Sequence, residues 1–370
     1  MAQLDGLRAI AVCLVMVAHF CPMSWVPIVE PLGPMGVRLF FVLSGFLITG
    51  ILLRARDRMQ DQGVGRWEVF KWFYARRTLR IFPMFYLVLV LTTLVDIKPV
   101  RETFWWHAGY LSNFLFASLG DWYGRASHFW SLAVEEQFYL VWPWVVLCLP
   151  AASLLPVIGV ALTLGPLSRW AGMMAGQTEV TVSVLPQGCL DTLGMGALLA
   201  YLWHRGLLDA ERRRIWGRRL LAVAVPVWTV LLASHLIFDS GIWTVTFTDT
   251  ASGVVFLVLV DRTARGFTGR VGRFLSAPSM RYVGQISYSV YIIHNFMPHI
   301  LKPVFLSMNL PWSAPVSSPV QTVILFTASL AAASLTWKFV EAPINEFKDR
   351  VEFPRPSTPT ILREPAVVKS

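Results

Sequence analysis

Long, uninterrupted apolar segments alternate with short polar ones along most of the chain. A helix needs about 20 apolar residues to cross the hydrocarbon core of a bilayer, and several of the segments approach that length. A transmembrane barrel would instead show strands of about ten residues with alternating polarity. The pattern therefore predicts an all-α polytopic membrane bundle. The apolar segments are 7–24, 33–53, 78–97, 104–118, 130–149, 151–168, 188–204, 217–237, 247–261, 281–307 and 319–341.

Basic residues gather in three of the intervening stretches, 54–80, 205–219 and 262–281. Cytoplasmic loops of membrane proteins carry an excess of Lys and Arg, so all three stretches are predicted to face the cytoplasm. An even number of crossings must then separate the first two stretches, yet five apolar segments lie between them. The segment 104–118 is the weakest, because it is short and contains polar residues. We expect it to form a re-entrant or interfacial helix on the outer side.

This assignment leaves about ten transmembrane helices, with both termini in the cytoplasm. Residues 1–350 form one membrane-embedded domain, and the Pro-rich stretch 351–370 is expected to be a disordered cytoplasmic tail. The first segment resembles a secretory signal in length. We reject that interpretation because only Arg8 precedes its apolar core, no clear cleavage site follows, and ten more apolar segments come after it.

Composition narrows the function classes further. Hydrophobic residues make up 55% of the 370 residues and charged residues 15%, and the mean hydropathy is +0.56. A soluble domain has about 25% charged residues, so a soluble enzyme and a disordered chain are excluded. The net charge of +10 does not indicate nucleic-acid binding, because the basic residues lie between apolar segments. That distribution is typical of the loops of a membrane protein, so the predicted partner is the lipid bilayer. The four cysteines lie in or beside apolar segments without metal-ligand spacing, which predicts neither a zinc site nor a disulfide framework.

Charged and imidazole groups inside membrane helices are costly and are often functional. Arg8 and His19 are eleven residues apart. At about 100° and about 1.5 Å per residue they share one helix face, roughly 16 Å apart along the axis. An arginine at the lipid headgroups together with a structural histidine is the alternative interpretation.

Arg77 and Arg80 share a face at the start of the third segment. Two guanidinium groups at a cytoplasmic helix start suit phosphate binding; contact with lipid headgroups is the alternative.

Two further segments carry polar stripes. Ser131, Glu135 and Tyr139 recur at four-residue intervals, with Glu136 beside them. Adjacent carboxylates at the edge of a span are hard to explain structurally. The alternative interpretation is that Glu136 is exposed and Glu135 belongs to a buried ion pair.

The second stripe lies near the C-terminus, where Ser287, Tyr291 and His294 share a face and Tyr288 is nearby. Hydrogen bonding between helices is its default explanation. Asp191 is expected to form an intramembrane ion pair with an arginine.

Taken together, the segments resemble the integral membrane acyltransferase family 3, bacterial O-acyltransferases that act on surface glycans. The resemblance extends from Leu4 to about Arg350. Each motif is weak alone, and their order makes the resemblance strong. The matching motifs are Leu4-Asp5-Gly6-Leu7-Arg8-Ala9 followed by His19, the stretch Gly36 to Ile48, Arg77-Thr78-Leu79-Arg80-Ile81-Phe82-Pro83, Trp130-Ser131-Leu132 with Glu135 and Gln137-Phe138-Tyr139, Ile286 to Tyr291 with His294, and Glu341-Ala342-Pro343.

The chain departs from the family pattern in two respects. Many members place an arginine two residues before the seventh-span aspartate, where this chain has Cys189, so Asp191 lacks its expected local partner. Some members also carry a C-terminal extracytoplasmic hydrolase-like domain. The sequence contains none, and we expect acyl delivery directly to the acceptor.

The resemblance implies acetyl-CoA, or another acyl-CoA, as the donor, bound from the cytoplasm by Arg8, Arg77 and Arg80, with no metal ion. Gly45 would let the thioester approach the backbone. His19 would act as general base and Glu135 would orient its imidazole, as the acid does in a catalytic triad. A ping-pong route through an acyl-His intermediate is the alternative.

The acceptor is expected to be a sugar hydroxyl of an exopolysaccharide or a lipid-linked glycan, at a bacterial inner (plasma) membrane. The candidate acceptor-binding residues are Asn113, His128, Ser131, Glu136, Tyr139, Tyr288 and His294. Acylation of a small cytosolic acceptor such as an antibiotic, or transport across the membrane, are the competing functions. A transporter would favour inverted repeats, and none is evident. The sequence leaves the oligomeric state open, a homo-oligomer included.

Overall fold

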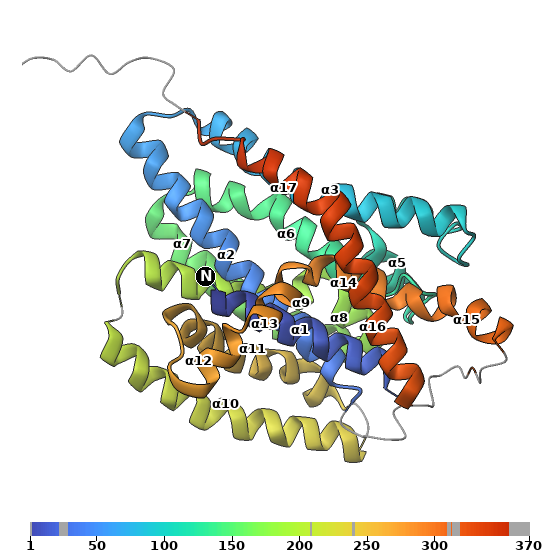
Figure 1. Ribbon diagram of the computed structural model, residues 1–370. Helices are drawn as coiled ribbons and strands as arrows, with labels where there is room; N and C mark the ends of the chain where they lie inside the picture. The colour runs from blue at the N-terminus through green and yellow to red at the C-terminus, as the bar shows by residue number, and fades with distance from the viewer. Residues whose placement is uncertain are drawn as a thin grey trace, which may run out of the picture.

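A computed structural model describes residues 2–21, 29–207, 209–238, 241–308, 312 and 319–354. Every regular element in this described part is a helix, which confirms the predicted all-α class (Figure 1). In chain order the helices are α1 (Ala2–Phe20), α2 (Leu32–Gln62), α3 (Arg66–Leu94), α4 (Phe104–Ala108), α5 (Ser112–Leu119), α6 (Phe129–Cys148), α7 (Ala151–Met174), α8 (Glu179–Val184), α9 (Pro186–His204), α10 (Ala210–Phe238), α11 (Ile242–Arg265), α12 (Gly269–Leu275), α13 (Pro278–Gln285), α14 (Ser287–Ile293), η1 (His294–Phe296), α15 (Met297–Ser307), α16 (Pro319–Thr336), η2 (Trp337–Glu341) and α17 (Ala342–Asp349).

Within those residues, seven helices are long and apolar enough to cross a membrane. These are α1, α2, α3, α7, α10, α11 and the rod that runs from α16 to α17. Three further segments, α6, α9 and α14–η1–α15, complete the bundle, and α6 and α9 both pack along α2. The structure is therefore a polytopic helical membrane protein, as the apolar pattern predicts.

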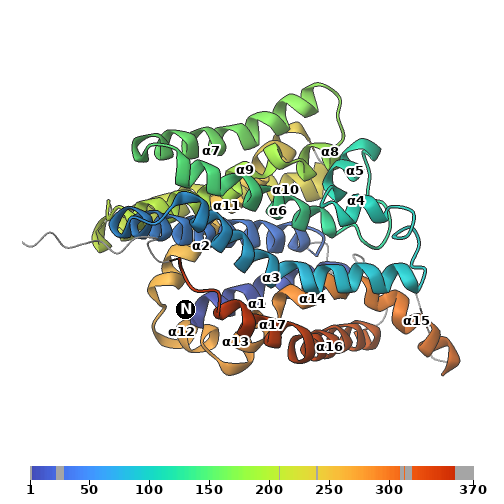
Figure 2. The same ribbon diagram turned by 90° about the horizontal axis from the view of Figure 1, so that it is seen from above.

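The centre of the bundle is the close contact between α2 and α9. A Cβ atom on Gly45 would clash with the carbonyl oxygen of Leu193, and one on Gly196 would clash with that of Val42. The two glycines therefore let the two helix backbones approach, as small residues do between membrane helices. Seen from above, the helices are layered from α7 through α9 and α2 to α1 and α16 (Figure 2).

Contacts between helix ends show that the three basic stretches lie at one end of the bundle. His204, at the end of α9, pairs with Asp57 of α2 at 3.2 Å. The indole of Trp203 donates to Asp261 of α11 at 2.9 Å. The ends of α2, α9 and α11, and the basic stretches that follow them, therefore meet at one place. We call it the basic end.

Both ends of the described chain also lie at the basic end. The side chain of Gln3 donates to the carbonyl of Phe267 at 3.0 Å, and Arg76 of α3 pairs with Asp349 of α17 at 3.0 Å. The N-terminus of α1 and the end of α17 therefore lie on the same side of the bundle as the basic stretches, as the count of crossings in the sequence predicts.

The segment 104–118 does not cross the bundle. It divides into α4, of 5 residues, and α5, of 8 residues. At about 1.5 Å per residue neither approaches the length of a span. The sequence predicted a single re-entrant or interfacial helix, and two short helices stand in its place. Tyr110, between them, has a positive φ of 53° and breaks the helix.

The beginning of the Pro-rich tail contacts the bundle. Arg76 donates to the carbonyl of Val351 at 3.1 Å, and the ring of Phe353 lies 5.2 Å from that of Trp72. The predicted disorder of the tail falls mostly on residues 355–370, which lie outside the described residues.

Asp191 is paired, but by an arginine that local sequence does not indicate. Arg169 of α7 donates to Asp191 at 2.8 Å, and both side chains are fully buried. Thr250 of α11 donates to the same carboxylate at 2.6 Å. Where the family places an arginine, Cys189 instead accepts a hydrogen bond from Arg38 at 3.0 Å. The ion-pair prediction is thus confirmed with a partner from another helix.

Candidate functional site

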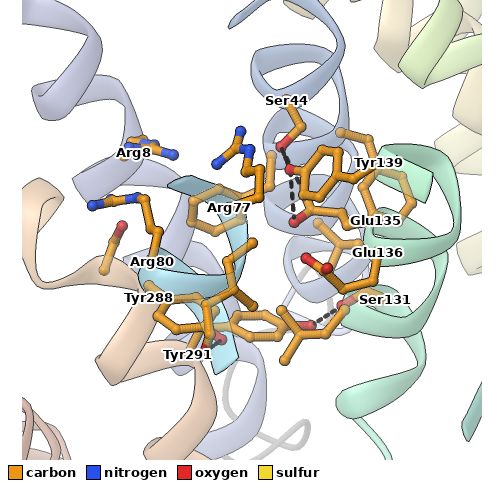
Figure 3. A pocket seen from close by; sticks show the side chains of 16 residues that line it. Arg8, Ser44, Arg77, Arg80, Ser131, Glu135, Glu136, Tyr139, Tyr288 and Tyr291 are labelled. Carbon is orange, nitrogen blue, oxygen red and sulfur yellow. Dashed lines mark hydrogen bonds between the residues drawn. The ribbon is translucent and has the colours of Figure 1, made fainter. Parts of the chain in front are cut away.

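Three arginines from two helices line one cavity, which we call the arginine cavity. Arg8 comes from α1, and Arg77 and Arg80 come from α3 (Figure 3). The cavity encloses about 700 Å³ up to its opening. Its lining residues are Arg8, Val37, Phe40, Phe41, Ser44, Arg77, Arg80, Ile81, Ser131, Leu132, Glu135, Glu136, Tyr139, Ser287, Tyr288 and Tyr291.

The guanidinium groups of these arginines lack carboxylate partners. None of the three forms an ion pair with another described residue. The Nε atom of Arg8 is buried without a hydrogen-bond partner, and Arg77 lies over the ring of Tyr139 at 4.6 Å from its centroid. Clustered, half-buried cations are costly unless they are compensated. The cavity is therefore electrostatically prepared for an anion.

Helix α6 supplies the opposite wall of the cavity. Ser44 of α2 donates to Glu135 at 2.8 Å, and Tyr139 donates to Ser44 at 2.9 Å. Glu136 projects into the cavity from the same wall, beside Glu135 (Figure 3). The predicted stripe of Ser131, Glu135 and Tyr139 therefore does face one space, and carboxylate oxygens face the arginines across it.

A second cavity adjoins the first at the basic end. It measures about 430 Å³, with the open space at its mouth included, and shares Arg77 and Arg80 with the arginine cavity. Lys348 of α17 and Arg76 add two more cations to its wall, and we call it the Lys348 cavity. Lys348 was missed by the sequence analysis, because nothing in the local sequence places residue 348 beside the third span.

Tyr291 and Ser131 close the arginine cavity at the end away from the basic end. The Ser131 and Tyr291 hydroxyl oxygens are 2.5 Å apart, and the Phe40 ring lies 6.1 Å from that of Tyr291. On its other side the Tyr291 ring lies 5.6 Å from His128 and 5.7 Å from His294. A single layer of side chains thus separates the cavity from a group of histidines.

The histidine group consists of His19, His128 and His294. The rings of His19 and His294 are 4.9 Å apart, and those of His128 and His294 are 5.1 Å apart. His19 is exposed at the end of α1, whereas the other two are buried.

Helix packing places this group close to the end of the arginine cavity. Val37 lines the cavity, and its neighbour Gly36 abuts Val15 of α1. His19 follows Val15 by one helical turn, about 6 Å. The imidazole of His19 therefore lies just beyond the closed end of the cavity.

The predicted orientation of His19 by Glu135 is not formed in this structure. Glu135 accepts hydrogen bonds from Ser44 and Tyr139, whereas His19 contacts His294 and the carbonyl of Val15. The reason is geometric, since Glu135 lies in the arginine cavity and His19 beyond its closed end. His19 on α1 and Glu135 on α6 therefore lie at different depths in the bundle.

Two other predicted contacts are also absent. Gly45 faces the backbone of α9 instead of the cavity, so its role is helix packing and not approach to a thioester. Asn113 is fully buried and exchanges two amide hydrogen bonds with Gln137, at 3.1 and 3.0 Å. With its amide satisfied and no cavity contact, Asn113 is a structural residue in this arrangement.

Each of the remaining predicted residues lies either in the arginine cavity or in the histidine group. Tyr288 lines the arginine cavity and donates to the carbonyl of Ile81 at 2.8 Å. Glu136, expected to face the outer acceptor, lines this cavity instead. His128 and His294 belong to the histidine group.

The sequence model of a family described as an acyltransferase domain matches residues 1–338. The matched region contains all of the arginine cavity and the histidine group, and it ends before Lys348. No solved structure matches the chain significantly.

Curated relatives cover most of this chain. Peptidoglycan O-acetyltransferase OatA of Listeria monocytogenes is 28% identical over 93% of this chain and 56% of its own length. O-acetyltransferase OatA of Staphylococcus aureus strain NCTC 8325 is 26% identical over 93% of this chain and 57% of its own. A putative O-acetyltransferase of S. aureus strain MSSA476 is 25% identical over 100% and 61%. The chain therefore spans between 56% and 61% of the length of these relatives.

Proposed function

Because the chain belongs to the integral membrane acyltransferase family 3, we propose that it transfers an acetyl group from acetyl-CoA to a sugar hydroxyl of a glycan. One observation carries the proposal. Three arginines without carboxylate partners line a cavity whose closed end lies beside an exposed histidine. An anionic donor and a general base are what such an acyl transfer requires.

The phosphates of the donor would bind at the basic end. Arg77 and Arg80 are shared by both cavities, and Lys348 extends the cationic wall outward. Guanidinium groups bind phosphate through paired, charge-assisted hydrogen bonds. The diphosphate and the nucleotide would occupy the Lys348 cavity, and the pantetheine arm would enter the arginine cavity. The excess of basic residues at this end supports a cytoplasmic location for it, on the side where acyl-CoA is found.

The wall opposite the arginines suits the pantetheine arm. That arm carries two amide N–H groups and a hydroxyl, and Glu136 and Glu135 offer carboxylate oxygens that accept hydrogen bonds. Apolar side chains such as Val37 and Phe41 line the same space. The thioester would then reach the closed end formed by Ser131 and Tyr291.

His19 would act as general base on the acceptor hydroxyl. An imidazole is suited to this role because its ordinary pKa lies near neutral pH. The exposure of His19 at the end of α1 leaves it open to an acceptor arriving from the side opposite the basic end. The donor and the acceptor would thus reach the imidazole from opposite sides of the membrane.

The acceptor is proposed to be a glycan outside the cytoplasm. The relatives named as O-acetyltransferases support an acetyl donor, and the Listeria relative is named for peptidoglycan. Exopolysaccharide and lipid-linked glycan precursors present the same chemistry, a secondary or primary sugar hydroxyl. The membrane would be the inner (plasma) membrane of a bacterium.

The test is a transfer assay with purified protein in proteoliposomes. Acetyl-CoA labelled in the acetyl group is supplied with a soluble exopolysaccharide or a peptidoglycan oligosaccharide, and both free CoA and labelled glycan are measured. We expect CoA release to match label transfer, and both to be lost in His19→Ala. The matched control is His299→Ala, at an exposed histidine of α15. Label moving into the vesicles without release of CoA would reject the enzyme.

A further inference from the structure

His294 holds a defined tautomer in the histidine group. Its Nδ1 atom lies 2.7 Å from the carbonyl oxygen of Tyr291. A carbonyl oxygen only accepts hydrogen bonds, so Nδ1 of His294 carries the proton and donates it. In the neutral ring the Nε2 atom then has a free lone pair. That atom lies 3.3 Å from Nδ1 of His19.

The same reasoning assigns the tautomer of His19. Its Nδ1 atom lies 2.9 Å from the carbonyl oxygen of Val15, so this nitrogen carries a proton. The proton is shared between the Val15 carbonyl and the lone pair of His294. The Nε2 atom of His19 is therefore the unprotonated nitrogen, on the ring that is exposed while His294 is buried.

His128, the third member of the group, does not compete for these contacts. Its Nε2 atom donates to the carbonyl of Ile292 at 3.0 Å, and its Nδ1 atom accepts from Asn295 at 3.3 Å. Both ring nitrogens are occupied. Glu135 is occupied in turn by Ser44 and Tyr139. Among the side chains in the described residues, the partner of the His19 imidazole is thus His294.

We propose that His294 is a positioning residue for His19: a neutral imidazole that, together with the Val15 carbonyl, holds the Nδ1 proton of the base and accepts a hydrogen bond from its protonated form. This inference rests on the proposed acetyl transfer. In that reaction Nε2 of His19 takes the proton of the acceptor hydroxyl while the hydroxyl oxygen forms an ester bond with the thioester carbonyl carbon. The carbon–sulfur bond breaks, and the proton passes to the departing thiolate. His294 takes the position of the carboxylate in a catalytic triad.

Two amide substitutions separate positioning from packing. A Gln side chain extends about as far as Nε2 of histidine and can offer its oxygen to His19, whereas an Asn side chain extends only to Nδ1. We expect His294→Asn to lower kcat by about 10-fold or more, as lost orientation of a base does, with KM for acetyl-CoA unchanged. We expect His294→Gln to recover most of that kcat. His299→Asn, at an exposed histidine of α15 outside the histidine group, is the control and should leave kcat unchanged.

The outcomes distinguish the inference from the function on which it rests. If the wild-type protein releases no CoA with any glycan, the proposed function fails. If the wild-type protein is active and His294→Asn retains full kcat, the positioning role fails alone. Equal losses of kcat in the Gln and Asn variants, with equal thermal stability, would also overturn it. A rise in KM for acetyl-CoA as the main effect would assign His294 to the donor site instead.

Discussion

The hydroxyl oxygens of Ser131 and Tyr291 lie 2.5 Å apart and close the arginine cavity toward the histidines. Tyr291 faces the cavity with its hydroxyl group and contacts His128 and His294 with its ring. In the proposed reaction, a thioester that enters beside the arginines would pass this pair before His19 acts on the acceptor. Tyr291 therefore lies between the arginine cavity and the histidine group.

Filling this end of the cavity should stop transfer without stopping donor binding. Ser131→Leu adds apolar bulk where the acyl group would pass and removes the hydrogen bond to Tyr291. We expect kcat to fall by about 100-fold, since small misplacements at a reacting centre have effects of this size. Affinity for CoA, measured by calorimetry, should stay unchanged. Ser131→Ala, which removes the hydroxyl without adding bulk, is the control and should retain most of the activity. A fall in CoA affinity would place Ser131 at the nucleotide instead.

The arginines should act on donor binding. Arg77→Ala and Arg80→Ala each remove a charged group that has no carboxylate partner among the described residues. We expect KM for acetyl-CoA to rise by about 10-fold in each variant, equivalent to about 1.4 kcal/mol. KM for the glycan should be unchanged. Arg66→Ala, at an exposed position on the same helix, should behave like the wild type. An effect on glycan kinetics alone would contradict a donor site.

Lys348 should recognise the nucleotide end of the donor only. The side chain of Lys348 is 15% exposed and lines the second cavity with Arg76, Arg77 and Arg80. Lys348→Ala should raise KM for acetyl-CoA several-fold, as loss of one charged hydrogen bond does. It should leave the rate with acetyl-pantetheine, which has no nucleotide, unchanged. Lys338→Ala is the control, at an exposed lysine of the same helical rod. Equal effects on both donors would remove the nucleotide from this cavity.

The sequence predicted those parts of the site that depend on one helix. Spacing placed Ser131, Glu135 and Tyr139 on one face, and all three line the arginine cavity. Spacing along one helix does not show which residues of a second helix lie at the same level in the bundle. Glu135 therefore meets Ser44, which is 91 residues away in sequence, and not His19. Hydrophobic segments and basic stretches likewise predicted the class of fold and which segments share one end.

What the sequence could not provide were partners from distant helices. Asp191 lost its expected local arginine and gained Arg169 of α7, because a buried carboxylate requires a cation from whichever helix can supply one. Lys348 lines the second cavity because α17 packs against α3. A glycine within a span indicates a close approach, but not whether a ligand or another helix makes it. At Gly45 that neighbour is α9.

The buried pair of Arg169 and Asp191 should be needed for stability. Asp191→Asn would leave Arg169 fully buried with its charge uncompensated. Breaking a buried pair in this way costs about 3–5 kcal/mol, so we expect a large fall in the thermal unfolding midpoint of the detergent-solubilised protein. Glu68→Gln breaks the exposed pair with Lys71, whose side chain is 72% exposed. It should cost less than about 1 kcal/mol. Similar midpoints for the two variants would show that the buried pair is dispensable.

Gly45 provides the sharpest separation of packing from donor binding, because the sequence assigned it to the donor and the structure assigns it to α9. Gly45→Ala would force a methyl group against the carbonyl oxygen of Leu193 at the close contact between α2 and α9. Overpacking of this kind costs about 1–3 kcal/mol, so the thermal midpoint should fall. The protein that remains folded should bind acetyl-CoA with unchanged KM. Gly159→Ala is the control, because a Cβ atom added at this helix position would meet no other atom within 4 Å. It should leave the thermal midpoint and KM unchanged. A rise in KM at full thermal stability would return Gly45 to the donor site and would require a path for the thioester along α2.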